Sequence, residues 1–260
     1  VGTARARRGM RWARATVAVA VALALCACGP SIGTPDSSGR DGATADAACS
    51  APTYCPLEDW SRWQAAVFVL RTIYGSNHTP PPLPGGMSGF DDVPDTHFAA
   101  PWIRELADLG ITTGCGGTNF CPNDPVSRAQ AAVFLVRAEE EAAQAGAALT
   151  YQPPTPSGVT FTDVPDTHYF YAWIEDFAAR GYPETGCTGN TFCPAEPVLR
   201  HQAAQWAWTL RTLVNGDPVT PPPTPSMYTP CDVDATTPHS AWIETIWVDG
   251  ITRGCGMPVE

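Results

Sequence analysis

Three arginines occupy equivalent places in a repeated motif, each directly before an apolar stretch. The motif reads Ser-Arg-Trp-Gln, Ser-Arg-Ala-Gln and Leu-Arg-His-Gln, and its arginines are Arg62, Arg128 and Arg200. A Ser-x-x-Gln pattern predicts a helix capping box, which needs no ligand. A cation in the first turn opposes the helix macrodipole, so the arginines need a separate reason. Two remain open: contact with an acidic ligand group, or a salt bridge to a neighbouring carboxylate.

The arginine motif belongs to a unit with a Cys-x5-Cys loop and an apolar helix, and a second kind of unit alternates with it. The second unit starts with Phe-x-Asp-Val, or a degenerate version of it, and carries a tryptophan eight residues before a glycine. These tryptophans could stack on a sugar, but at helical spacing beside isoleucine they are more typical of a core. They are Trp102, Trp173 and Trp242.

The order of the units divides the chain into two whole repeats with half a repeat at each end. Neither half can bury its apolar face alone, so we expect the two halves to pair and close a ring of three. The helices after the cysteine loops are apolar nearly all round, which is typical of buried helices. The predicted fold is therefore mainly α, a central three-helix bundle with the tryptophan helices outside. The predicted ranges are 49–89 (half repeat and proline-rich linker), 90–160, 161–227 and 228–260 (half repeat).

The cysteines predict disulfide-braced loops. Each Cys-x5-Cys loop closes on itself in this interpretation, which leaves the last two cysteines to pair with each other. The alternative is that the cysteines coordinate zinc, and an oxidising compartment disfavours this alternative. The predicted pairs are Cys49–Cys55, Cys115–Cys121, Cys187–Cys193 and Cys231–Cys255.

The N-terminal segment predicts export. Residues 1–27 combine a basic region with an apolar run that is too short to span a membrane, as in a secretory signal peptide. The run ends in Leu-Cys-Ala-Cys, which resembles a bacterial lipobox and predicts lipidation of Cys28. A plain secretory peptide cut nearby is the alternative. Residues 28–48 lack periodicity and predict a flexible tether.

Composition limits the partners. Without residues 1–27 the chain has 10 arginines and 26 acidic residues, a net charge of −16, which repels nucleic acid and anionic membranes. We therefore expect no nucleic-acid partner, and membrane contact through the lipid only. The sequence has no G-x-S-x-G, H-E-x-x-H or P-loop pattern, so we expect no enzyme, no catalytic residue and no cofactor. We also expect no metal, because turn and cap chemistry explains the aspartates near His97, His168 and His239.

The motifs resemble a known family when they are taken in order. F-x-D-V, Trp-Ile, Gly-Ile-Thr-x-Gly, Phe-Cys-Pro and Val-Ser-Arg-Ala-Gln, followed by an apolar helix, resemble the S-layer homology (SLH) domain over about 49–255. The resemblance implies a pseudo-threefold helical assembly of three repeats. It also implies attachment to the bacterial envelope through a secondary cell-wall polysaccharide, typically pyruvylated, or another peptidoglycan-linked polymer, bound in grooves between repeats. The family's Thr-Arg-Ala-Glu motif matches residues 127–130 most closely.

These observations predict a non-catalytic anchoring module on the cell surface. The three arginines, and secondarily the three tryptophans, are its candidate polymer-binding residues. A lipid at Cys28 would make the chain a tether between a membrane and the wall. The alternative is a protein-interaction scaffold of the same fold that binds no polymer. Glutamine in place of the family's glutamate and the acidic composition favour that alternative.

Overall fold

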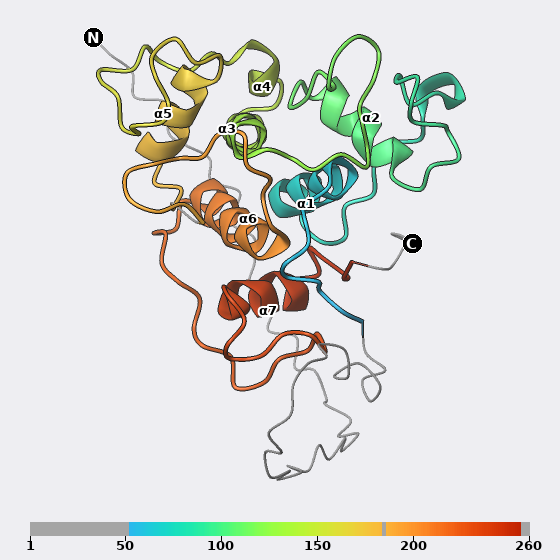
Figure 1. Ribbon diagram of the computed structural model, residues 1–260. Coiled ribbons are helices and arrows are strands. Elements are labelled where there is room, and N and C mark those ends of the chain that lie inside the picture. Colours follow the sequence, from blue (N-terminus) through green and yellow to red (C-terminus); the bar gives the residue numbers. More distant parts are fainter. Residues whose placement is uncertain (1–51, 184–185, 256–260) are drawn as a thin grey trace, which may run out of the picture. The chain divides into compact units, whose positions relative to one another are not determined.

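The computed structural model describes residues 52–183 and 186–255, and their regular structure is helical. The described part contains no strand, only isolated bridges, so the predicted mainly α class is confirmed. The predicted signal peptide, Cys28 and the tether lie outside the described residues. The elements are α1 (Arg62–Tyr74), η1 (Pro84–Gly86), α2 (Ala100–Asp108), α3 (Arg128–Ala143), α4 (Ala147–Thr150), α5 (Tyr171–Ala179), α6 (Arg200–Asn215) and α7 (Ser240–Val248) (Figure 1).

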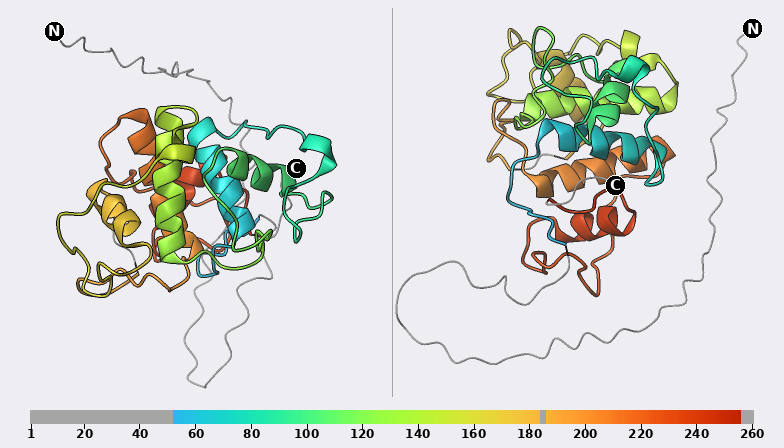
Figure 2. Two further views of the ribbon diagram at one scale, coloured as in Figure 1. Left: turned by 90° about the horizontal axis from the view of Figure 1, so that it is seen from above. Right: turned by 90° about the vertical axis from the view of Figure 1, so that its right-hand side faces the viewer.

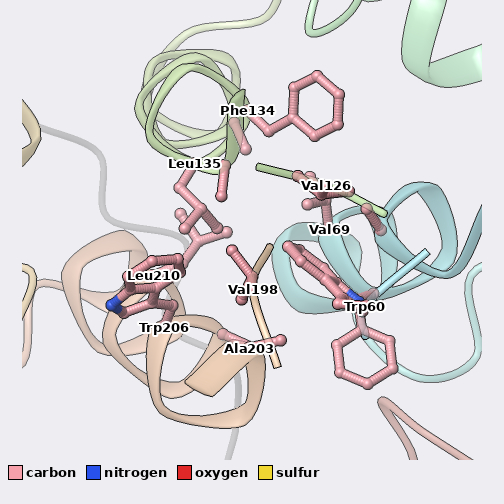
Figure 3. Packing of buried hydrophobic residues seen from close by; sticks show 14 of the residues in the cluster. Trp60, Val69, Val126, Phe134, Leu135, Val198, Ala203, Trp206 and Leu210 are labelled. Carbon is pink, nitrogen blue, oxygen red and sulfur yellow. The ribbon is translucent and has the colours of Figure 1, made fainter. Parts of the chain in front are cut away.

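Helices α1, α3 and α6 contact one another pairwise and contribute much of the hydrophobic core. Figure 3 shows side chains from all three, among them Val69, Phe134 and Leu210, meeting with residues of the preceding segments. The apolar sequence explains this position, because a helix without a polar face is stable only when it is covered on every side. In α1 nearly every residue is buried.

A closed cycle of backbone hydrogen bonds joins the segments that precede these three helices. The Trp60 amide donates to the Val198 carbonyl at 2.7 Å, and the Val198 amide donates to the Val126 carbonyl at 2.9 Å. The Val126 amide completes the cycle by donating to the Trp60 carbonyl at 2.9 Å. Because each segment leads directly into its helix, the cycle brings the three helix N-termini, and with them the three motif arginines, together.

The three nine-residue helices pack outside. Helix α2 contacts α1, α5 contacts α3 and α7 contacts α6 (Figure 2). Gly110, Gly181 and Gly250 follow these helices, all with positive φ, a conformation that glycine adopts without strain. The chain can therefore reverse after each outer helix and run back toward a core helix. No helix of the described part is both long enough and apolar enough to cross a bilayer.

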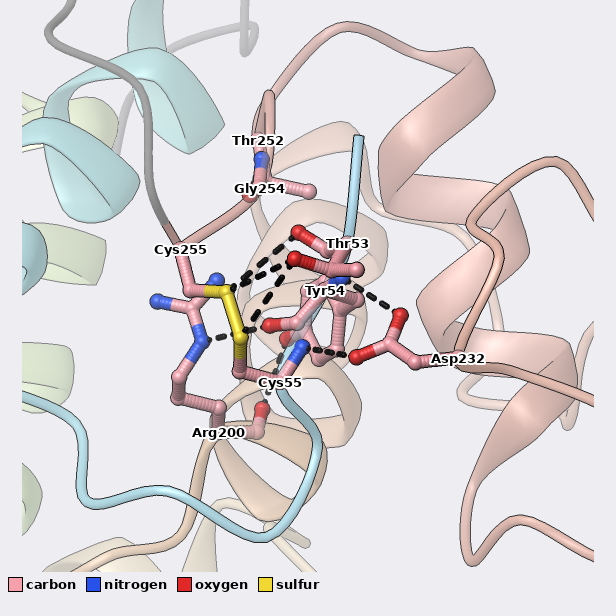
Figure 4. The surroundings of a disulfide bond; sticks show 8 residues. All are labelled: Thr53, Tyr54, Cys55, Arg200, Asp232, Thr252, Gly254 and Cys255. Atoms are coloured by element: carbon pink, nitrogen blue, oxygen red, sulfur yellow. Dashed lines mark hydrogen bonds between the residues drawn. A yellow bond between two sulfur atoms is a disulfide. The ribbon is translucent and has the colours of Figure 1, made fainter. Parts of the chain in front are cut away.

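An aspartate of each Phe-x-Asp-Val unit anchors a cysteine loop. Asp92 accepts hydrogen bonds from two loop amides at 2.7 and 2.6 Å, and Asp163 does the same at 2.8 and 2.7 Å. Asp232 accepts from the amides of Tyr54 and Cys55, which lie at the other end of the chain, at 2.6 and 2.5 Å (Figure 4). The C-terminal half unit thus holds the N-terminal loop as the two internal units hold their own.

Two of the predicted disulfides are confirmed and two are wrong. The confirmed pairs are Cys115–Cys121 and Cys187–Cys193. Cys55 is bonded to Cys255, 200 residues away in sequence (Figure 4). This bond excludes the two remaining predicted pairs, Cys49–Cys55 and Cys231–Cys255.

The two wrong pairs follow from the positions of Cys55 and Cys255 in the repeated pattern. Cys255 ends a Gly-Ile-Thr-x-Gly segment as Cys115 does, and Cys55 has a φ of 57°, the same value as Cys121. Cys55 and Cys255 thus correspond to the two partners of the Cys115–Cys121 disulfide, but they lie at opposite ends of the chain. Cys231 is also disulfide-bonded, and Cys49 lies outside the described residues.

Candidate functional site

The three motif arginines point into the protein. Arg62, Arg128 and Arg200 are only 2%, 1% and 0% exposed. In each case Nε donates a hydrogen bond to a carbonyl of the cysteine loop that belongs to a neighbouring core helix. The acceptors are the carbonyls of Phe120, Phe192 and Tyr54, at 2.7, 2.5 and 2.8 Å respectively.

Aromatic rings cover the arginine side chains. The Arg62 guanidinium lies 4.8 Å from the centre of the Phe120 ring and 5.4 Å from that of Phe134. Arg200 lies in the same way over Tyr54 and Phe68, at 4.7 and 5.8 Å. Such stacking is favourable for a poorly hydrated guanidinium. Each of these arginines therefore links a cysteine loop and a core helix of the adjacent repeat.

These contacts explain structurally why an arginine occupies the first turn of each core helix, which the sequence did not indicate. For Arg62 and Arg200 the described residues provide no ion pair, so the salt-bridge alternative finds no support for these two. Burial lowers the pKa of both groups, although Asp92 and Asp124 act on Arg62 from a distance in the opposite direction. Direct contact between these buried arginines and a polymer remains a prediction.

The three tryptophans pack against the core. Trp102 is buried, and the Arg71 guanidinium lies over its ring at 5.1 Å. Trp173 and Trp242 are half-buried against the core. Stacking on a sugar is therefore not needed to explain these side chains, and it remains a prediction for the two half-buried rings.

A groove lies between α1 and the segment 251–254 that follows the last outer helix. Arg71 of α1, Arg200 of α6 and Arg253 of this segment all line the groove. Arg253 is exposed, whereas Arg71 and Arg200 are buried. No carboxylate belongs to the described residues that line the groove.

The acids nearest to the groove lie outside its lining, where Glu58 and Asp232 act on Arg200 and raise its pKa against the effect of burial. Burial lowers the pKa of Arg71, and the positive charge of Arg253 lowers it further. Within the described residues, Nε of Arg71 and both Nη atoms of Arg200 are buried without a hydrogen-bond partner. Buried unpaired donors are costly, and the exposed Arg253 adds a positive charge that an anion in the groove could pair with directly. The groove is therefore suited to a carboxylate or another acidic group.

The corresponding position beside α3 is less basic. Arg137 corresponds to Arg71, but its Nη1 donates to the Gly110 carbonyl at 3.2 Å and its guanidinium lies 4.8 Å from the Trp173 ring centre. Thr113 stands where the groove has Arg253. The groove beside α1 is therefore more basic than the corresponding position beside α3.

Beside α6, Thr209 stands where α1 has Arg71, and its hydroxyl donates to the Gln205 carbonyl.

Sequence reasoning missed Arg71 and Arg253 as site residues. One signal could have revealed Arg253: the Gly-Ile-Thr-x-Gly segment has threonine at position 113 but arginine at position 253.

A histidine pair lies where α6 and α7 begin. The Nδ1 atoms of His201 and His239 are 2.7 Å apart, and their rings are stacked at 4.9 Å. Burial and the neighbouring His239 lower the pKa of His201 to about 4. An unfolded histidine titrates near pH 6.5, so the unfolded chain binds the proton more readily. This pair therefore stabilises the fold above pH 6.5 and loses that contribution as the pH falls toward 4.

We expect His201→Ala to flatten the dependence of stability on pH between 6.5 and 4. Alanine occupies the equivalent position in α3, at Ala129, so the helix can accommodate it. The difference in slope should be at most about 1.4 kcal/mol per pH unit. Urea unfolding at a series of pH values measures it. Parallel profiles for the wild-type protein and the variant would contradict the prediction.

Part of the sequence matches a known domain. Residues 89–132, which include α2, the Cys115–Cys121 loop and the start of α3, match the S-layer homology domain. An S-layer homology domain is present in this chain. SLH domains generally anchor proteins to the cell wall, which indicates a location at the cell surface or in the envelope.

A similar protein is consistent with the SLH match. The chain is 31% identical over 118 residues to an endoglucanase of Bacillus sp. (strain KSM-635). The matched segment is 45% of this chain but 11% of the endoglucanase, so the two share only a small part of the larger protein.

Proposed function

We propose that this protein is a non-catalytic anchoring module of the cell envelope, which holds an acidic cell-wall polymer in the groove beside α1. One observation carries the proposal. Arg71, Arg200 and Arg253 reach this groove from three separate segments, and no carboxylate belongs to its described lining. An SLH domain in the same chain makes a wall polymer the fitting ligand.

The proposed architecture is a pseudo-threefold SLH assembly of three repeats, the third divided between the two ends of the chain. The closed hydrogen-bond cycle through Trp60, Val126 and Val198 supports it. The bonds from Asp232 to the N-terminal loop and the Cys55–Cys255 disulfide support it further. In this arrangement the groove lies where the third repeat is completed.

The proposed ligand is a secondary cell-wall polysaccharide or another peptidoglycan-linked polymer that carries a carboxylate, such as a pyruvyl group. The acidic composition repels polyanions at a distance, so binding depends on the local arginines. Guanidinium groups bind carboxylates through short, charge-assisted hydrogen bonds. If Cys28 carries a lipid, the same chain would tether a membrane to the wall.

We expect Arg253→Gln to weaken binding to bacterial sacculi that retain their pyruvylated polymer by about tenfold, because one charge-assisted hydrogen bond contributes about 1.5 kcal/mol. Arg253 is exposed, so the substitution should leave the fold intact. Co-sedimentation of the purified exported chain with sacculi, at several salt concentrations, measures the effect. The variant should also show a shallower salt dependence.

Arg104→Gln provides a matched control. This arginine is also on the surface, where it pairs with Asp108 on α2, and its loss changes the net charge equally. It should bind like the wild-type protein. If Arg253→Gln binds as tightly as Arg104→Gln, the groove is not the polymer site, and the scaffold without polymer binding becomes the better interpretation.

A further inference from the structure

Trp63 connects the arginine groove to a second feature, which we call the aromatic shelf. The shelf consists of Trp63, at the start of α1, and of His97 and Phe98, in the loop before α2. The Trp63 and Phe98 rings meet edge to face with their centres 4.7 Å apart, and His97 stacks on Phe98 at 4.7 Å. Trp63 also lines the groove, so the shelf and the groove form a continuous surface.

The shelf keeps aromatic surface in contact with solvent. Phe98 is 38% exposed, and Trp63 is half-buried. The backbone beneath is fixed, because the Trp63 amide donates to the Pro122 carbonyl at 2.9 Å. The backbone at Trp63 is therefore held before any ligand binds, and the contact with Phe98 restricts its ring, which lowers the entropic cost of binding.

The shelf is specific to this groove. The position of Trp63 in α1 is occupied by Ala129 in α3 and by His201 in α6. His201 is only 7% exposed and is engaged with His239, so it presents little surface to a ligand. Tryptophan thus replaces the smaller residue of the motif only beside the groove that has three arginines.

We infer that the aromatic shelf binds a neutral pyranose ring, the sugar next to the acidic group that the arginines hold. This inference rests on the proposed function, because it assumes that the polymer occupies the groove. The axial C–H bonds of a pyranose carry partial positive charge and pack well on the negative face of an aromatic ring. Aromatic walls combined with a few charged groups are typical of sites that fix a ligand's orientation.

The two parts of the surface would then recognise different chemistry. Arg71 and Arg253 select the acid, and Trp63 and Phe98 select the adjoining sugar by shape. An acid alone, such as free pyruvate, would occupy only the arginine groove. A polymer of the same charge without a suitable sugar beside each acid would lose the contribution of the shelf.

The test compares Trp63→Ala and Phe98→Ala in co-sedimentation with sacculi that retain their pyruvylated polymer. Trp63→Ala recreates the Ser-Arg-Ala-Gln motif that already starts α3, so the fold should accept it. Each variant should bind more than about fivefold more weakly, since truncation of an aromatic anchor at a contact costs over 1 kcal/mol. The salt dependence should stay as in the wild-type protein, because no charge is removed.

Tyr169→Ala is the matched control, because Tyr169 occupies the position of Phe98 in the next repeat and is 88% exposed. It should bind like the wild-type protein. Normal binding by Trp63→Ala and Phe98→Ala, with weak binding by Arg253→Gln, would overturn the shelf and leave the polymer groove intact. Normal binding by all three variants would overturn both. If Trp63→Ala unfolds, Phe98→Ala decides alone, since its side chain is on the surface.

Discussion

Replacing Cys55 and Cys255 together with serine is expected to lower the free energy of unfolding by up to about 5 kcal/mol, because on the loop-entropy model the stabilisation grows with the length of chain that the bond closes. The bond spans 200 residues. It also fixes the C-terminal segment that forms one wall of the groove. Cys231 is disulfide-bonded as well, and any link it makes across the same stretch of chain lowers the figure.

The internal pair Cys115 and Cys121 gives the matched control, with the same chemical change and a separation of only 6 residues. Its replacement by serine should cost about 2 kcal/mol on the same model. Urea unfolding of both double variants, followed by circular dichroism, measures the difference. Equal losses would show that closure of the chain depends on buried contacts and not on the long-range disulfide.

Arg62→Ala is expected to lower the free energy of unfolding by about 3 kcal/mol, through the loss of a buried charge-assisted hydrogen bond and of the packing around the side chain. Its Nε donates to the Phe120 carbonyl at 2.7 Å, and its guanidinium lies between the rings of Phe120 and Phe134. Arg62→Lys should recover only part of this loss, because an ammonium group lacks the planar fork that stacks on the rings.

Arg104→Ala is the control for this substitution. Arg104 is partly exposed and pairs with Asp108 one turn away, so its loss should cost about 0.5 kcal/mol or less. Thermal unfolding of the three variants ranks them directly. A melting temperature for Arg62→Ala close to that of Arg104→Ala would contradict a structural role for the buried arginine.

The buried position of the motif arginines also determines how polymer binding should be tested. Replacing Arg62, Arg128 and Arg200 together would remove three contacts between neighbouring repeats, so a loss of wall binding could follow from unfolding alone. Arg253 avoids this difficulty because it is exposed. The functional experiment therefore belongs at the groove and not at the motif.

Local signals in the sequence predicted the local structure well. The apolar stretch after Ser61 predicts a helix from Arg62 to Tyr74, and α1 has these bounds. The Ser-x-x-Gln pattern predicts a capping box, and Ser127 and Gln130 form one, with Gln130 Oε1 accepting from the Ser127 amide at 3.2 Å. Periodicity and caps involve residues within one helical turn, so the sequence alone contains what decides them.

Only the tertiary structure decided the long-range features. The sequence paired Cys55 with a close neighbour, whereas folding brings Cys255 beside it across the closure of the two chain ends. The same closure places Arg253 beside α1 and creates the groove.

The sequence singled out the motif arginine, but it did not predict the surroundings of the side chain. The rings and carbonyls that receive Arg62 belong to a different repeat and meet it only on folding. The sequence therefore determined the helices and two of the short disulfide loops. The tertiary structure decided which cations lie inside and which face a ligand, because burial and contact depend on segments that are remote along the chain.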